Sequence, residues 1–96
     1  MIQSFKDDGT EDIFNGLSTR KALKIPKEIW PIVRRKLDML NTAHELIDLR
    51  VPPGNRLEKL YGRLTGCHSI RVNDQYRIIF KWLSHDAEDV LVTDYH

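Results

Sequence analysis

The sequence predicts an α+β fold in which helices cover one face of an antiparallel β-sheet. Residues 26–41 carry apolar side chains at helical spacing, whereas residues 66–82 alternate apolar and polar side chains as strands do. A Pro-Pro-Gly stretch within residues 51–55 separates the helical half of the chain from the sheet half. Because the helices precede the strands, we expect two or three helices to lie together on one face of the sheet.

The length and composition predict a single domain, residues 1–96. Of the 96 residues, 41% are hydrophobic and 30% are charged, as is typical of a soluble globular protein. No apolar run approaches the roughly 20 residues of a membrane span, and residues 1–8 do not resemble a signal peptide. A lone cysteine without a secretion signal is typical of a cytoplasmic protein, and we expect Cys67 to pack at the start of a strand.

Local signals predict the N-terminal elements. Residues 1–6 alternate imperfectly and are expected to form a short strand. Asp7 or Asp8 is suited to cap a brief helix that ends before Gly16. Residues 16–25 are expected to form a basic loop.

The longest helix is predicted from Pro26 to about Asn41. Proline is tolerated in the first turn of a helix, so the position of Pro31 favours a start near Glu28. The apolar residues of this helix share one face: Ile29, Trp30, Val33, Leu37 and Leu40. Its basic residues are expected on the outer side: Arg34, Arg35 and Lys36.

The remaining elements follow the same patterns in chain order. They are a second short helix at 42–49, the break at 51–55, a strand around 57–61, a turn at 62–66, a hairpin at 66–82 with its turn at 73–75, an acidic loop at 84–89 and a strand at 90–95. The last strand is a nearly continuous apolar run, which predicts an inner position in the sheet.

The hairpin has one apolar face and one polar face. The apolar side chains are Ile70, Val72, Tyr76, Ile78, Phe80 and Trp82. The opposite face carries Arg71, Arg77 and Lys81, and cations at strand spacing suit a polyanion. The same spacing is equally typical of the solvated outer face of an antiparallel sheet.

A net charge of +1 conceals strong segregation of charge along the chain. Residues 19–36 and residues 50–81 each carry seven basic groups, whereas acids dominate residues 1–18, 37–49 and 82–96. Local positive potential of this kind attracts a phosphate-rich partner. We interpret the first basic block mainly as solvated helix and loop surface.

The chain ends in Asp94, Tyr95 and His96, which combine a carboxylate, a phenol and an imidazole. Histidine can act as a general acid or base near neutral pH, and the terminal carboxylate beside it would raise its pKa. The alternative is that Tyr95 packs, Asp94 caps and His96 is solvated, as terminal residues often are.

The histidines do not predict a metal site. His44, His68, His85 and His96 show no paired ligand spacing, so we expect neither a metal nor another cofactor. His68 falls on the Ile70 side of the hairpin, where it is expected to be a partly buried packing residue.

Cations and aromatic side chains gather after the break. The cations are Arg56, Lys59, Arg63, Arg71, Arg77 and Lys81, and the tyrosines are Tyr61, Tyr76 and Tyr95. Arginine makes bidentate contacts with phosphate, and aromatic rings stack on unpaired bases. Together with a terminal histidine, these groups are the equipment of a metal-independent ribonuclease, which activates the ribose 2′-OH and protonates the 5′-oxygen.

Several strings of residues resemble the HigB toxins of the RelE superfamily, the plasmid maintenance killer proteins. They are residues 35–41, residues 49–58, residues 68–80 with Trp82, and residues 92–96. The resemblance covers nearly the whole chain and implies a RelE-like fold with a curved antiparallel sheet. It also implies ribosome-dependent cleavage of mRNA and neutralisation by a HigA-like helix-turn-helix antitoxin.

The resemblance also implies roles for particular residues. Arg77 matches the family's phosphate-contacting arginine, and Arg71 matches a hairpin arginine that contacts RNA. Asp94, Tyr95 and His96 match the C-terminal active-site run.

Two positions depart from the family pattern. Tyr61 stands where close relatives have lysine, and Glu58 stands where one branch has histidine. A second catalytic group is therefore expected from Lys59, Arg63 or Glu58. The alternative function is a weakly catalytic or non-catalytic toxin that binds the ribosome and acts with its antitoxin as a co-repressor on operator DNA.

Overall fold

The computed structural model describes residues 1–95 and confirms the predicted α+β architecture. The α-helices are α1 (Asp8–Phe14) and α2 (Trp30–Thr42). The 3-10 helices are η1 (Ala22–Lys24), η2 (Lys27–Ile29), η3 (Leu46–Arg50), η4 (Pro53–Asn55) and η5 (Gly62–Leu64). The strands are β1 (Glu58–Lys59), β2 (Cys67–Arg71), β3 (Tyr76–Leu83) and β4 (Asp86–Asp94).

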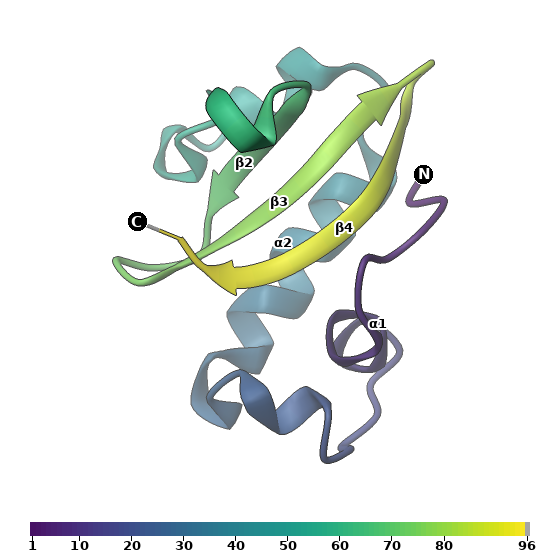
Figure 1. Ribbon diagram of the computed structural model, residues 1–96, viewed down its shortest axis with the longest axis vertical. Helices are drawn as coiled ribbons and strands as arrows, with labels where there is room; N and C mark the ends of the chain where they lie inside the picture. The colour runs from purple at the N-terminus through teal and green to yellow at the C-terminus, as the bar shows by residue number, and fades with distance from the viewer. Residues whose placement is uncertain (96) are drawn as a thin grey trace.

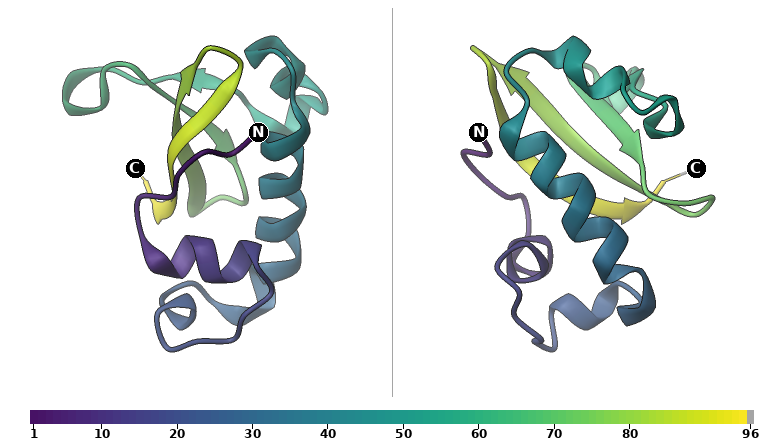
Figure 2. Two further views of the ribbon diagram at one scale, coloured as in Figure 1. Left: turned by 90° about the vertical axis from the view of Figure 1, so that its right-hand side faces the viewer. Right: turned by 180° about the vertical axis from the view of Figure 1, so that it is seen from behind.

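Within residues 1–95, the four strands form one antiparallel sheet in the order β1-β2-β3-β4. Figure 1 shows β3 between β2 and β4. Figure 2 shows α2 running across one face of the sheet, with the strands curving over it. The hairpin of β2 and β3 is confirmed, whereas β1 is shorter than the strand expected at 57–61. None of the helices in this part of the chain is both long enough and apolar enough to span a membrane.

The N-terminal segment does not form the predicted strand. Ile2 and Phe5 instead make isolated parallel bridges to Ala87 and Val90 of β4. Backbone hydrogen bonds join the two segments, and Gln3 N donates to Ala87 O at 2.8 Å. The segment thereby covers an edge of β4 that would otherwise be open to pairing with another chain.

The predicted cap of the first helix is confirmed. Asp7 is extended, and its Oδ1 accepts a 2.8 Å hydrogen bond from the backbone nitrogen of Thr10. Gly16, beyond the helix, has a φ of +75°, a conformation that favours glycine. Gly9 lies so close to the next segment that an added Cβ would be 2.6 Å from the carbonyl oxygen of Lys21.

The main helix begins slightly later than predicted. A turn of 3-10 helix precedes it, so α2 starts at Trp30 and not near Glu28. Pro31 lies in its first turn, where the missing N–H removes no helical hydrogen bond. The predicted apolar residues of the helix are buried or pack against the buried core.

Lys36 does not lie on the outer side of α2, so the position expected from its charge is wrong. Only 7% of its surface is exposed, and its ammonium donates a hydrogen bond to Oδ1 of Asn55. At helical spacing Lys36 lies one turn from the buried Val33 and Leu40, so the backbone directs it inward whatever its charge.

The second short helix predicted at 42–49 is the 3-10 helix η3, which begins only at Leu46, after α2 has ended at Thr42. Asp48 Oδ2 accepts hydrogen bonds from the backbone nitrogens of His44 at 3.1 Å and Glu45 at 3.0 Å. Local bonds of this kind compete with the continuous hydrogen bonding of an α-helix.

Residues 84–89 are not the predicted acidic loop. Leu83 pairs with Asp86, so a turn of two residues joins β3 to β4. Ser84 and His85 have φ angles of +50° and +78°, as the type I′ turn of a tight hairpin requires. The residues of this turn are not the Asn-Gly or Asp-Gly pairs that usually signal it.

A β-bulge explains why β4 was expected to start later. The register with β3 shifts between Ile79 and Lys81, and Asp89 has a φ of +52°. Ala87 and Val90 would lie on opposite faces of a regular strand. Because the bulge adds a residue between them, both are fully buried in the main core. β4 is also the last strand in the sheet order, and not an inner strand.

The two faces of the sheet have different roles. The apolar face of the hairpin packs against α1 and α2 in the main core, as predicted. The opposite face carries a smaller apolar cluster of Leu60, Cys67 and Ile79, with Leu64 and Tyr95 packed against it. This second face is therefore ordered around a small core of its own beside its charged residues.

Candidate functional site: an arginine-lined pocket

A pocket of about 270 Å³ opens on the face of the sheet opposite α2. Its lining comes from the loop after η4, from β1, from the hairpin and from the residue after β4: Arg56, Glu58, Arg71, Asn73, Asp74, Arg77 and Tyr95. We call it the arginine pocket. It brings together four predicted site residues from separate segments: Arg56, Arg71, Arg77 and Tyr95. Glu58, expected only in a supporting role, lies in the same wall.

Arg77 is the most firmly held residue of the pocket, and its side chain is only 12% exposed. Its Nε donates to Ser69 Oγ at 2.8 Å, and its Nη2 donates to the carbonyl oxygen of Arg56 at 2.7 Å. Glu58 Oε2 lies 4.0 Å from the same Nη2. These contacts fix the plane of the guanidinium while the group still lines the pocket.

The electrostatics of Arg77 combine burial with neighbouring charges. Burial lowers the pKa of Arg77, the carboxylate of Glu58 opposes this change, and Arg71 and Arg56 add to the lowering. An arginine side chain nonetheless stays charged near neutral pH. Three arginines against two carboxylates, Glu58 and Asp74, give the lining a net positive charge in a partly desolvated place, which suits a phosphate group.

Arg71 and Arg56 complete the cationic lining in different ways. Arg71 is half-buried, and its Nη2 donates to the carboxylate of Asp74, three residues further on in the hairpin turn. Arg56 is exposed and has a left-handed backbone with φ +45° and ψ +57°, which is uncommon for a residue other than glycine. Its carbonyl is thereby available to Arg77.

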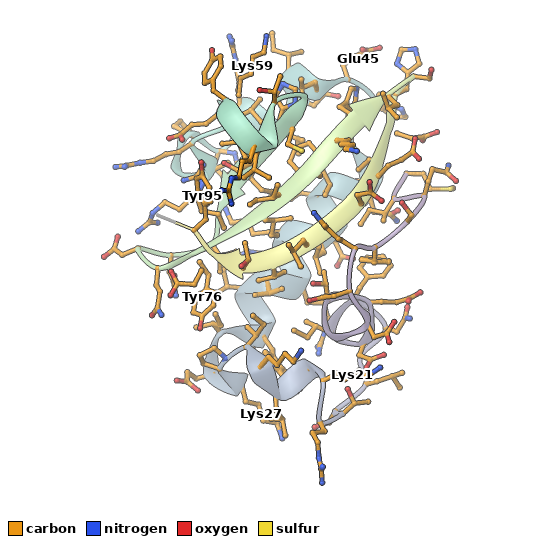
Figure 3. All side chains as sticks on the ribbon, in the orientation of Figure 1. Lys21, Lys27, Glu45, Lys59, Tyr76 and Tyr95 are labelled. Carbon is orange, nitrogen blue, oxygen red and sulfur yellow. The ribbon has the colours of Figure 1, made fainter. Side chains whose placement is uncertain are left out.

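Tyr95 follows the end of β4 and lies beside the sheet near β2 and β3 (Figure 3). Tyr95 lines the pocket and packs against the second apolar cluster. Asp94 Oδ2 accepts a 3.0 Å hydrogen bond from Gln75 Nε2, which ties the end of β4 to the hairpin turn. His96, the expected proton-transfer group, lies outside the described residues.

Other predicted residues lie outside the pocket lining. Lys59 on β1, Tyr61 before η5 and Arg63 within η5 are exposed, and the side chain of Tyr61 is 73% exposed. Lys81 lies on the same face as Arg77 but forms an ion pair of 3.4 Å with Asp89. These four residues would contact only a ligand that extends beyond the pocket.

Two residues that the sequence did not single out hold the site together. Ser69 is fully buried and receives the Nε–H of Arg77, and Gln75 anchors Asp94. The alternation of the hairpin contained a signal for Ser69, because it shares the polar face with Arg71. Gln75 had no such signal, because its partner is nineteen positions away in sequence.

The histidines within residues 1–95 lie away from the pocket lining. His68 stacks on Phe80 with ring centroids 6.1 Å apart, as expected of a packing residue, and its Nδ1 has no hydrogen-bond partner in this part of the chain. Burial lowers the pKa of His68, and the charge of Lys59 adds to the effect. His85 lies in the turn between β3 and β4, and its Nδ1 is 3.0 Å from a carboxylate oxygen of Glu45.

The sequence is similar to known toxins over most of its length. Residues 3–96 match the model of the HigB-like toxin family, described as the RelE-like toxin of the type II toxin–antitoxin system HigB. Toxin HigB-1 of Vibrio cholerae is 45% identical over 83 residues, covering 86% of this chain and 85% of the relative. An uncharacterized protein of Haemophilus influenzae is 35% identical over 88 residues, covering 92% and 85%.

The fold is similar to that of the Staphylococcus aureus toxin YoeB. A chain of the YoeB-YefM complex superposes with a TM-score of 0.61 at 14% identity, covering 100% of this chain and 98% of that chain. A chain of the YoeB dimer gives a TM-score of 0.58 at 18% identity, covering 99% and 97%. At these identities the likeness concerns the fold alone.

Proposed function

Because the chain belongs to the HigB-like family of RelE-like toxins from type II toxin–antitoxin systems, we propose that it is an endoribonuclease that cleaves mRNA on the ribosome. Cleavage of mRNA in the act of translation stops protein synthesis, which is how such a toxin would inhibit growth. Acting on ribosomes requires a cytoplasmic location.

The observation that carries this proposal is the state of Arg77. The guanidinium is nearly buried, oriented by Ser69 and the Arg56 carbonyl, and flanked by the guanidinium of Arg71 in the same pocket. Two oriented arginines are suited to hold a phosphodiester and to stabilise the extra negative charge of a pentavalent phosphorus. A surface arginine that served only solubility would not need such fixed geometry.

The proposed reaction is an acid–base transfer that needs no metal. The ribose 2′-oxygen forms a bond to phosphorus while its proton passes to a base, and the P–O5′ bond breaks as the 5′-oxygen takes a proton from an acid. The products are a 2′,3′-cyclic phosphate and a 5′-hydroxyl. Arg77 and Arg71 would stabilise the phosphoryl oxygens throughout.

Glu58 and His96 are our candidates for the two proton-transfer groups. Glu58 lines the pocket beside Arg77, where its carboxylate could accept the proton of the 2′-OH. His96 directly follows the pocket residue Tyr95 in the chain, and it would protonate the leaving 5′-oxygen. Asp94 would orient that imidazole, and Tyr95 would stack on a base.

The proposed protein partner is a HigA-like antitoxin with a helix-turn-helix. The similar YoeB chains include some from complexes of that toxin with YefM, which supports an antitoxin partner for a toxin of this fold. We propose that the antitoxin neutralises this chain and also links it to operator DNA.

Replacement of Arg77 tests the proposal directly. Arg77→Ala, produced without an antitoxin, should fail to arrest growth and should leave translated mRNA intact, because the phosphate loses its main ligand. Arg20→Ala is the matched control, since Arg20 is exposed and lies outside the pocket. Full growth arrest by a folded Arg77→Ala variant would reject the assignment.

A second pair of variants separates cleavage from binding. Glu58→Gln and His96→Gln keep polar side chains but remove the proposed base and acid, so each should abolish mRNA cleavage. If ribosome binding and growth arrest persist in both variants, the chain is instead a binding toxin. Binding should weaken as salt increases in either case, because phosphate contacts release counterions.

A further inference from the structure

Lys36 is a buried cation whose partner is neutral. Its ammonium donates to Oδ1 of Asn55, and no carboxylate oxygen within residues 1–95 forms an ion pair with it. Burial lowers the pKa of Lys36, and the charges of Arg35 and Arg71 lower it further. A buried charge without a counter-ion is costly to folding, so a role in the core alone does not explain it.

Asn55 links this lysine to the loop that precedes β1. Its side chain is fully buried, and its Nδ2 donates to the carbonyl oxygens of Leu49 at 3.1 Å and Val51 at 3.4 Å. With Oδ1 occupied by Lys36, the amide has partners on both of its ends. The loop from 49 to 55 is therefore fastened to α2 through one side chain.

The next residue in the chain, Arg56, forms part of the arginine pocket. Its left-handed backbone presents its carbonyl oxygen to Nη2 of Arg77 at 2.7 Å. A left-handed conformation costs energy for a residue with a Cβ and persists only where neighbouring contacts impose it. The contacts of Asn55 supply that constraint immediately before Arg56.

We propose that Lys36 and Asn55 are positioning residues for the arginine pocket: their buried hydrogen bond fixes the loop so that the Arg56 carbonyl holds the guanidinium of Arg77 in place. The connection runs from α2, on one face of the sheet, to the pocket on the other face. The inference rests on the proposed function only in taking RNA phosphate as the anion that the pocket binds.

The test measures Arg77 itself in full-length, isotopically labelled protein. Lys36→Met keeps an unbranched apolar side chain that is one atom shorter, and it removes the ammonium donor. The Nε–H resonance of Arg77 should therefore shift, and its exchange with water should accelerate by about tenfold or more. Affinity for a short single-stranded DNA oligonucleotide, which lacks the reactive 2′-OH, should fall about tenfold, as for one lost charge-assisted hydrogen bond. Lys6→Met is the control for an exposed lysine, and it should change both quantities by less than about twofold.

A folded Lys36→Met protein with an unchanged Arg77 resonance overturns the proposal, whatever its affinity for the oligonucleotide. If wild-type protein does not bind the oligonucleotide, phosphate is not the anion of the pocket, but the Arg77 resonance still decides the role of Lys36.

A measurement on wild-type protein covers the case in which Lys36→Met does not fold. Saturation with phosphate-bearing oligonucleotide should shift the side-chain amide resonances of Asn55, because that amide is coupled to Arg77 through the loop. The exposed Asn15 should not respond and serves as the internal control. If the Asn55 resonances stay fixed while those of Arg77 move, the two residues are not coupled and the proposal is wrong.

Discussion

Arg71 and Arg77 are direct cross-strand partners on β2 and β3, and their side chains share one face of the sheet. Like charges at this position of an antiparallel pair are unfavourable by themselves. Asp74 pairs with Arg71, and Glu58 approaches Arg77, so each cation has a carboxylate beside it. A phosphate group that displaces these carboxylates can bind both guanidiniums at once.

Asp74→Asn should increase the affinity of the pocket for anions. The substitution removes a carboxylate that competes with phosphate for Arg71, while the amide keeps its size. We expect a few-fold tighter binding of a single-stranded oligonucleotide at low salt, with the difference shrinking as salt increases. Fluorescence anisotropy over a salt series measures it, with Asp38→Asn on the exposed side of α2 as the control. Weaker binding by Asp74→Asn would contradict this account of the pocket.

Glu58→Gln should separate binding from catalysis. The substitution removes the carboxylate near Arg77, so oligonucleotide affinity should be kept or slightly increased. Cleavage of translated mRNA should fall by about 10²-fold or more, as for the loss of a general base. Single-turnover kinetics give both quantities, and Glu28→Gln, at an exposed position in η2, is the control. Parallel losses of binding and cleavage would assign Glu58 a structural role instead.

Ser69→Ala should weaken both the fold and the site. The variant leaves the Nε–H of Arg77 without its partner in a partly buried place, at a cost of about 1–3 kcal/mol in the free energy of unfolding. Urea denaturation measures this change. Ser18→Ala replaces an exposed serine and should lie within about 0.5 kcal/mol of wild type.

Gly9→Ala should destabilise the packing of α1 against the segment at 16–25, which contains η1. The new Cβ would lie 2.6 Å from the backbone oxygen of Lys21, and backbone atoms cannot move aside cheaply. We expect a loss of about 1–3 kcal/mol in thermal or urea denaturation. Gly54→Ala is a matched control, because its Cβ would meet no atom within 4 Å. Equal stability of the two variants would show that α1 can shift without cost.

His68 should make the fold less stable in mildly acidic solution. Burial, aided by Lys59, lowers its pKa below the 6.5 of a free histidine, so the unfolded chain takes up this proton more readily than the folded one. The contribution of His68 to the free energy of unfolding should therefore be fully present above pH 6.5. It should be lost as the pH falls from there through the lower pKa of His68 in the folded state. Urea midpoints over this range measure how steeply stability falls with pH. His68→Leu should reduce this dependence, and the control His44→Gln should leave it unchanged.

Local sequence patterns determined much of the fold. The alternation in residues 66–82 predicted both strands of the hairpin and the face on which each cation lies, because strand side chains alternate by geometry. The spacing of apolar residues likewise predicted α2, and Asp7 predicted the cap of α1. The strings shared with known toxins indicated the family.

Tertiary structure alone decided the features in which distant segments meet. Lys36 lies inside because the helix directs its side chain inward and Asn55, nineteen positions away, accepts a hydrogen bond from its ammonium group. The start of β4 was missed because a bulge breaks its alternation. The sequence of one segment does not show which residues of a distant segment will contact it. The arginine pocket is assembled from contacts of this kind.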